Sequence, residues 1–151
     1  MSKNIIIFYA VSEKHIKKFF FIKKKFKEYN FILVYDKHID KTILQKYNEK
    51  FYELNNNFFN SIRKKIKQIA YLFASTLQVR YDPLILSYFF YKYKIPVIAF
   101  QETHQFYLHN QYMNNYILPA DKYLICSQFE KEIFIKNKYP SNKIDVVGWD
   151  S

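Results

Sequence analysis

Short runs of apolar residues, each bounded by polar positions, recur along the chain and predict buried β-strands. They occupy residues 5–10, 31–35, 77–81, 95–100, 123–126 and 144–147. Continuous runs of this kind are typical of strands whose two faces are both covered, as the strands of a parallel sheet are.

Between the first two runs, apolar residues recur at helical spacing. Steps of three, three, four and three residues predict one buried helical face that Ser12 can cap. The face comprises Ile16, Phe19, Ile22, Phe26 and Tyr29.

The middle of the chain predicts two further helices, separated by three asparagines. Ile43, Tyr47, Phe51 and Leu54 share one helical face. After Asn55-Asn56-Asn57, a second face comprises Ile62, Ile66, Ile69 and Phe73. Both assignments rest on the period of the apolar positions.

Two more helices are predicted in the last half of the chain. Asp82-Pro83 begins a turn into an apolar helix over residues 84–93. Ser127 and Glu130 have the spacing of a capping box, which predicts a helix to about Lys138. Residues 105–118 are aromatic and polar and predict a loop with a helical portion.

Alternation of strands and helices predicts an α/β fold. We expect a Rossmann-like three-layer domain with a mostly parallel sheet of about five or six strands, spanning residues 1–151 as a single domain.

The formal charge of +11 raises the question of an anionic partner. The positive charge is concentrated in residues 1–100, but Lys, Asn, Ile, Phe and Tyr are also the residues of A/T-rich codons. Only Arg63 and Arg80 supply the guanidinium groups that suit bidentate base or phosphate recognition. Sequence-specific nucleic-acid binding is therefore disfavoured.

A single cysteine, Cys126, excludes an internal disulfide and a multi-cysteine metal site. It ends an apolar run, so we expect a buried, structural thiol. No run approaches the ~18 apolar residues of a membrane span, and the apolar stretch after Asn4 is too short for a signal peptide. We expect a cytoplasmic protein that is either free or peripheral on the inner membrane face.

Several motifs, in this order, resemble the amino-terminal half of GT-B glycosyltransferases, which use nucleotide-activated sugars. Val79-Arg80-Tyr81 ends a strand, and Ile95-Pro96-Val97 opens another that leads to Glu102-Thr103-His104. The strand within residues 120–127 begins with Ala-Asp and ends in serine, and residues 143–150 resemble the passage into the second domain.

The resemblance has departures. Many members of the family carry glycines after the first strand, whereas residues 9–12 contain none. Gly148-Trp149-Asp150 only approximates the Asn-Gly-Val-Asp setting of the family. The donor-binding carboxyl-terminal domain is absent from these 151 residues.

The resemblance implies the acceptor-side half of an enzyme that transfers a sugar from a nucleotide donor to a glycan or lipid-linked acceptor, as in cell-surface polysaccharide biosynthesis. The nucleotide sugar is then a substrate of the complete enzyme, and we expect no cofactor in this chain. The implied partner is a GT-B carboxyl-terminal domain in the same or another chain. Alone, the chain is expected to be inactive.

His104 and Glu102 are the predicted catalytic residues. The resemblance places His104 at the cleft between the two domains, where it can hydrogen-bond the donor sugar or phosphate. Both side chains point the same way if the segment is extended. The alternatives are that His104 ends the strand structurally and that Glu102 pairs with Arg80.

Four polar residues near predicted strand ends are candidates for acceptor binding, because ligands of open α/β sheets bind outside the carboxyl ends of the strands. They are Ser12, Arg80, Gln101 and Thr103. The residues from Gln101 to Tyr116 are rich in groups that stack on sugars or hydrogen-bond hydroxyls.

The first helix suggests a function of a different class. At ~100° per residue, Phe21 falls opposite the apolar face, together with Lys17, Lys24 and Lys25. An exposed Phe among lysines can dock on an anionic membrane surface. The alternatives are a solvated lysine face and a non-enzymatic basic module that binds membrane or nucleic acid through residues 14–27.

The remaining histidines, His15, His38 and His109, show no ligand spacing with one another or with Cys126. We therefore expect them to be solvated and expect no metal site.

Overall fold

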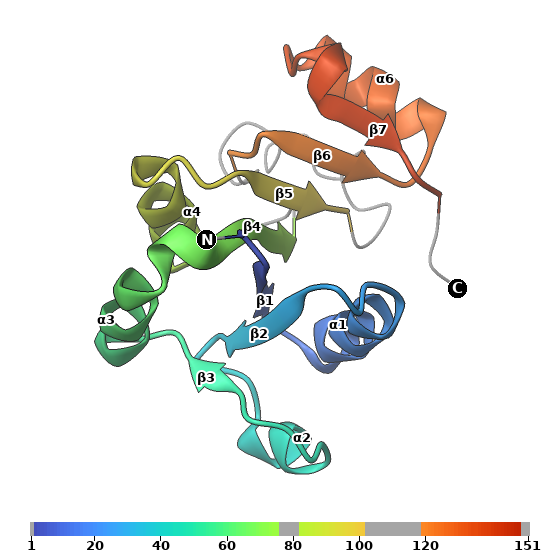
Figure 1. Cartoon of the computed structure of the whole chain (residues 1–151). Helices are drawn as coiled ribbons and strands as arrows, with labels where there is room; N and C mark the ends of the chain where they lie inside the picture. The colour runs from blue at the N-terminus through green and yellow to red at the C-terminus, as the bar shows by residue number, and fades with distance from the viewer. Residues whose placement is uncertain (1, 76–81, 102–118, 149–151) are drawn as a thin grey trace. The chain divides into compact units, whose positions relative to one another are not determined.

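The computed structural model describes residues 2–75, 82–101 and 119–148 (Figure 1). The chain divides into two compact units, Met1–Phe73 and Ala74–Ser151. Each is described separately below.

The first unit contains four strands: β1 (Ile5–Ala10), β2 (Asn30–Tyr35), β3 (Tyr52–Glu53) and β4 (Ile69–Ser75), of which β4 ends two residues inside the second unit. Their order is β3-β2-β1-β4, and each pair is parallel. The strand order therefore reverses at β1, with β2 on one side of it and β4 on the other.

This reversal distributes the helices of the first unit over both faces of the strands. α1 (Glu13–Lys25) joins β1 to β2, and α3 (Asn56–Lys64) lies between β3 and β4. The two connections run in opposite directions across the sheet, so right-handed crossovers bring their helices to opposite faces. Figure 1 shows α1 and α3 on opposite sides of the strands. The short α2 (Lys41–Gln45) precedes β3, and a 3₁₀ turn (Ile66–Gln68) precedes β4.

The second unit contains three strands and two helices among its described residues: α4 (Asp82–Lys92), β5 (Val97–Phe100), β6 (Lys122–Ile125), α6 (Gln128–Lys136) and β7 (Ile144–Val146). β6 pairs with β5 and with β7, in parallel on both sides. α4 packs against β5, whereas α6 packs against β6 and β7 (Figure 1).

Aromatic side chains fill the interior of each unit. In the first, the Phe8 ring centroid lies 5.7 Å from that of Phe19 and 6.5 Å from that of Phe73. In the second, Phe134 contacts Tyr123 and Tyr139, with ring centroids 5.7 and 5.2 Å apart. Every residue of β1 is buried, which explains why its sequence is apolar without alternation.

The predicted fold class is confirmed: the chain has an α/β, Rossmann-like three-layer fold with parallel strands. The described residues include seven strands, one more than the upper end of the prediction. The additional strands come from the middle of the chain.

The two helices predicted in the middle of the chain are wrong in their extent. α2 ends at Gln45, and Tyr52–Glu53 is a strand. α3 ends at Lys64, and the segment from Ile69 is β4. In β4, Ile69 and Leu72 are fully buried because the strand pairs with β1. Apolar residues at steps of three and four fitted a helix, but sheet pairing buries neighbouring positions as well.

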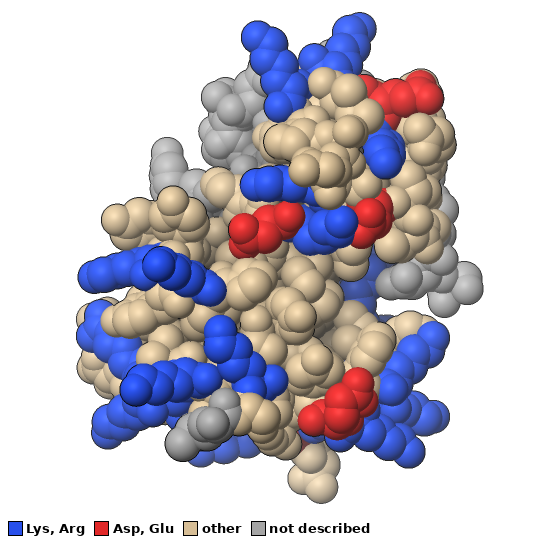
Figure 2. Space-filling model, turned by 45° about the horizontal axis from the view of Figure 1, so that its top comes forward, with Lys and Arg blue, Asp and Glu red and all other residues tan. Residues whose placement is uncertain are grey.

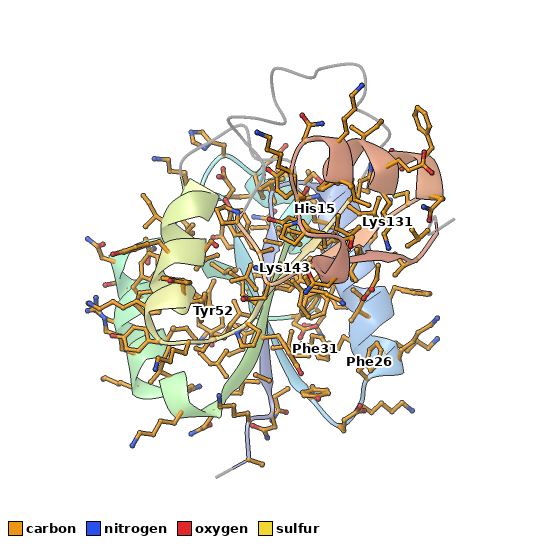
Figure 3. All side chains as sticks on the ribbon, turned by 90° about the horizontal axis from the view of Figure 1, so that it is seen from above. His15, Phe26, Phe31, Tyr52, Lys131 and Lys143 are labelled. Atoms are coloured by element: carbon orange, nitrogen blue, oxygen red, sulfur yellow. The ribbon has the colours of Figure 1, made fainter. Side chains whose placement is uncertain are left out.

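The first helix is shorter than its apolar pattern. It ends at Lys25, and Phe26 is the C-cap, with φ −111° and ψ 70°. Phe26 is 48% exposed, so it is not part of the buried face (Figure 3). The last turn is basic, which suits the negative end of the helix dipole.

The predicted strand at residues 77–81 and the predicted loop at 105–118 lie outside the described residues. Cys126 is buried, as expected. No helix within the described ranges is both long and apolar enough to cross a membrane.

Candidate functional site

The carboxyl ends of β1 and β2 lie side by side in the first unit and bring three polar side chains together. Ala10 is in register with Tyr35, and the next residue, Asp36, donates its backbone N–H to the Ala10 carbonyl oxygen at 2.9 Å. Asp36 is 0% exposed. A carboxylate at this depth requires hydrogen-bond donors to offset the loss of water.

One donor side chain comes from β1, and the others come from the turn after β2. The Tyr9 hydroxyl donates to Asp36 Oδ2 at 2.9 Å. The His38 backbone N–H donates to Asp36 Oδ1 at 2.8 Å, and His38 Nδ1 lies 2.8 Å from the same oxygen. The carboxylate therefore holds the His38 imidazole in one orientation, while 51% of the His38 side chain remains exposed.

Ser12 lies at the same edge, two residues beyond the end of β1. It is the N-cap of α1, and its hydroxyl oxygen accepts from the His15 backbone N–H at 3.4 Å. The structure thus places this predicted acceptor-binding residue at the carboxyl edge, with its oxygen in a helix cap.

The prediction that His15 is solvated is wrong. His15 is buried, and its Nδ1 accepts from the Val11 backbone N–H at 3.2 Å. Burial, followed by the positive charges of Lys18 and Lys14, lowers the His15 pKa from 6.5 to about 3. His15 lies four residues before Phe19 and therefore on the buried side of α1, so its helical spacing could have predicted its burial.

In the second unit, the carboxyl ends of β5 and β6 meet the start of α6 around a buried amide. Gln101 Oε1 accepts from the Cys126 backbone N–H at 2.8 Å, and Gln101 Nε2 donates to Glu130 Oε1 at 2.6 Å. Glu130 Oε2 accepts from the Ser127 hydroxyl at 3.0 Å, and Ser127 Oγ accepts from the Glu130 backbone N–H at 3.2 Å. The predicted cap by Ser127 is confirmed, whereas the Glu130 carboxylate accepts from the Ser127 hydroxyl instead of its backbone N–H and also binds Gln101.

This network bears on the predicted role of Gln101 in acceptor binding. The side chain is 3% exposed, and both ends of its amide make hydrogen bonds inside the protein. The structure therefore assigns Gln101 a part in joining two strand ends to a helix, and its contact with an acceptor stays a prediction.

The other predicted site residues of this region lie outside the described residues: Arg80, Glu102, Thr103 and His104, together with His109. Their predicted roles stay predictions.

The outer face of α1 has the arrangement expected from its sequence. Lys17, Phe21, Lys24 and Lys25 are all exposed. Phe21 is 52% exposed, and Lys25 Nζ lies 4.2 Å from the centroid of its ring. Figure 2 shows Lys and Arg side chains over much of the face drawn there, whereas Asp and Glu side chains appear in few places.

A hollow of ≈ 420 Å³ lies at the opposite edge of the second unit. Its lining comprises Tyr91, Lys92, Lys94, Ile95, Pro96 and Asp121. These residues precede β5 and β6, so the hollow lies at the amino ends of the strands rather than at the ligand-binding edge of an open α/β sheet. Asp121 Oδ2 accepts from the Val97 backbone N–H at 2.8 Å, which gives it a structural role there.

Within the described part of the chain, no three His, Cys, Asp or Glu side chains are grouped so that they could hold a metal ion.

The sequence pattern could place one of the three polar side chains at the carboxyl edge of the first unit. Asp36 follows a predicted buried strand, so its place at the sheet edge follows from the pattern. Tyr9 could not be recognised, because it occurs within an apolar run and only strand pairing brings its hydroxyl to Asp36.

No protein-family model, curated protein or solved structure matches this chain.

Proposed function

We propose that this chain is the acceptor-side half of a glycosyltransferase, which transfers a sugar from a nucleotide donor to a glycan or lipid-linked acceptor. The observation that supports this most is the reversal of strand order at β1 in a parallel α/β sheet, with hydrogen-bonding side chains at the carboxyl edge of β1 and β2. Ligand crevices of such sheets form at this kind of reversal.

The chemistry of the edge suits an acceptor better than a nucleotide. A dinucleotide site needs a glycine-rich turn after the first strand, so that the backbone can approach the pyrophosphate. The turn after β1 is Val11-Ser12, and the chain's only glycine is Gly148. Ser12 and His38 are instead groups that hydrogen-bond hydroxyls. The proposal therefore assigns the nucleotide sugar to a carboxyl-terminal partner domain.

Acceptor binding can be tested on the chain alone. We expect amide chemical shifts of residues 10–12 and 36–38 to change when soluble glycans or short-chain lipid-linked saccharides are titrated in, while residues 141–143 serve as an internal control. If no saccharide in a broad panel shifts these amides, the acceptor-side assignment fails.

Sugar transfer can be tested in the enzyme completed with its donor-binding domain. The proposal retains His104 and Glu102 as catalytic residues, and His104→Ala is expected to lower turnover by about 10²-fold, the lower end of the range for a proton-transfer group. Lys143→Ala is the control. Unchanged kinetics in His104→Ala would remove this residue from the site.

The outer face of α1 favours a second candidate function, docking on an anionic membrane surface. Burying a Phe side chain in the interface contributes roughly 2 kcal/mol, and each lysine close to anionic lipid adds ~1 kcal/mol. An exposed Phe21 surrounded by three exposed lysines combines both contributions. This function is compatible with a lipid-linked acceptor and also stands without catalysis.

Flotation with vesicles of anionic and of zwitterionic lipid tests this candidate. Replacing Lys17, Lys24 and Lys25 with Gln is expected to weaken binding to anionic vesicles about 10²-fold, from ~1 kcal/mol for each lysine. The control replaces Lys64, Lys65 and Lys67, which are also exposed and lie at the end of α3, at its C-cap and in the 3₁₀ turn that follows. Equal loss in both triple variants would indicate nonspecific attraction, and salt-sensitive polynucleotide binding without vesicle binding would favour the nucleic-acid alternative.

A further inference from the structure

The buried carboxylate of Asp36 is fixed from two directions. Tyr9, on the neighbouring strand, donates to Oδ2, and the His38 backbone donates to Oδ1. Both oxygens act as acceptors, as they do in an ionised carboxylate. A turn in which Asp accepts from the backbone two residues later would account for the second bond alone. It accounts neither for the Tyr9 bond nor for the imidazole at 2.8 Å.

This arrangement determines which nitrogen of His38 carries the proton. Because Asp36 Oδ1 accepts, Nδ1 must be the protonated nitrogen of the neutral ring, and Nε2 keeps its lone pair. Among the residues that the structure describes, Nε2 has no hydrogen-bond partner. The side chain is half-exposed, so a ligand at the carboxyl edge can reach this nitrogen.

A carboxylate that orients one imidazole nitrogen and leaves the other to accept a proton is the arrangement by which many enzymes activate a hydroxyl group. We propose that Asp36 and His38 form a proton-accepting pair for the acceptor hydroxyl, with Tyr9 as a positioning residue. This inference rests on the proposed function and adds to it a base located outside the residues predicted from the sequence.

The proposed reaction is a single displacement at the anomeric carbon. The acceptor O–H bond breaks, and its proton moves to His38 Nε2. The oxygen lone pair forms a bond to the anomeric carbon of the donor sugar, and the bond from that carbon to the nucleotide phosphate breaks, so the nucleotide leaves with the electron pair. Asp36 stabilises the imidazolium. A single displacement inverts the anomeric configuration, so the product has the anomer opposite to the donor.

Other acidic side chains near Asp36 and His38 make hydrogen bonds or ion pairs of their own. Asp40 caps α2 by accepting from the Thr42 backbone N–H at 2.9 Å. Glu13, at the start of α1, pairs with Lys46 at 3.4 Å between Oε1 and Nζ. Lys37, next to His38, is exposed. Asp36 is therefore the carboxylate that contacts the His38 ring.

The geometry is tested first on the isolated chain. Long-range proton–nitrogen correlation spectra at pH 8 are expected to show His38 in the Nδ1–H form. Asp36→Asn is expected to shift it toward the Nε2–H form that is ordinary for exposed histidines, whereas Asp40→Asn leaves it unchanged. If Asp36→Asn fails to fold, the test uses the wild-type spectrum together with that of Tyr9→Phe, which removes the Tyr9 hydrogen bond to Oδ2 and leaves the contact between Oδ1 and His38. A wild-type His38 in the Nε2–H form overturns the proposal.

The role is tested in the enzyme completed with its donor-binding domain. His38→Ala is expected to lower kcat by about 10²–10⁴-fold with little change in KM, and added imidazole to restore part of it. Lys37→Ala is the control. Because the His38 side chain is half-exposed, its truncation leaves the core intact, which thermal unfolding can verify.

The outcomes separate the two proposals. Transfer that is unaffected by His38→Ala, or transfer with retention of configuration, overturns the base assignment and leaves the proposed function standing. If the completed enzyme transfers no sugar from any nucleotide donor, both fail. Inversion together with a kcat loss that imidazole restores supports both.

Discussion

Among the described residues, each unit buries a carboxylate at the carboxyl edge of its strands, and the two carboxylates differ in what they contact. Asp36 and Glu130 are both 0% exposed. Glu130 contacts Gln101, which is a buried side chain, and Ser127, which is the N-cap of α6. Asp36 contacts His38, a side chain that remains half in solvent.

The comparison shows that burial of a charged group does not by itself indicate a site. Among the described residues, the Glu130 carboxylate makes its hydrogen bonds to Gln101 and Ser127, so its network joins two strand ends to a helix and stabilises the second unit. The network of Asp36 continues to the surface through an imidazole. A ligand at this edge can therefore exchange a proton with the Asp36 network through His38.

The largest effect is expected at Glu130. Glu130→Ala removes the carboxylate that accepts from both Gln101 Nε2 and the Ser127 hydroxyl inside the protein. We expect a loss of about 3 kcal/mol in the free energy of unfolding, measured by urea denaturation. Glu132→Ala, an exposed change on the same helix, is expected to stay within about 0.5 kcal/mol. Similar losses in both variants would contradict the structural role of the network.

The next effect is a pH dependence centred on His15. Its pKa is about 3 in the folded chain and near 6.5 when the chain is unfolded. Between these values the unfolded state binds more protons, so acidification destabilises the fold by ~1.4 kcal/mol per pH unit. By pH 4.5 the loss from this residue reaches roughly 2 to 3 kcal/mol, and above about pH 6.5 it vanishes.

Unfolding curves of the wild type and His15→Gln between pH 4.5 and pH 7.5 isolate this contribution from that of the carboxylates. The glutamine oxygen can still accept from Val11, so the variant keeps a partner for the backbone N–H while losing the titration. If the difference between the two chains does not change with pH, His15 is not protonated on unfolding and the assigned pKa is wrong.

Two tyrosines, one in each unit, test whether a hydrogen bond to a buried carboxylate contributes more than one to a neutral group. The Tyr9 hydroxyl donates to a buried carboxylate, whereas the Tyr123 hydroxyl accepts from the Ala120 backbone N–H at 3.1 Å. Hydrogen bonds to charged groups contribute about 1.5–3 kcal/mol, and neutral ones about 0.5–1.5 kcal/mol. Tyr9→Phe should therefore reduce stability more than Tyr123→Phe. The opposite order in paired denaturation curves would argue against an ionised Asp36.

The smallest effect on stability is expected at Phe21. Its side chain is half-exposed, so Phe21→Ser should change the free energy of unfolding by no more than about 0.5 kcal/mol. The same change should reduce binding to anionic vesicles, which makes it a cleaner probe of membrane docking than a core variant. A large loss of stability would mean that Phe21 packs in the fold instead.

Local patterns in the sequence predicted several features correctly. The apolar runs of β1, β5 and β6 each fill a strand, and Ser12 and Ser127 each cap the helix that follows. Phe21 was placed on the outer face of α1 by its period alone. These features depend on neighbours within a few residues, so a single sequence contains the information.

The sequence by itself determined the class of fold, because alternating buried strands and amphipathic helices have few other ways to cover both faces of a sheet. Tertiary structure decided that Ile69 begins a strand, because pairing with β1 outweighs a helical period. It also decided the partners of Asp36: Tyr9 is distant in sequence and reaches the carboxylate only because β1 and β2 pair in parallel register. Pairing between distant segments is a property of the folded chain, and no local pattern of residues specifies it.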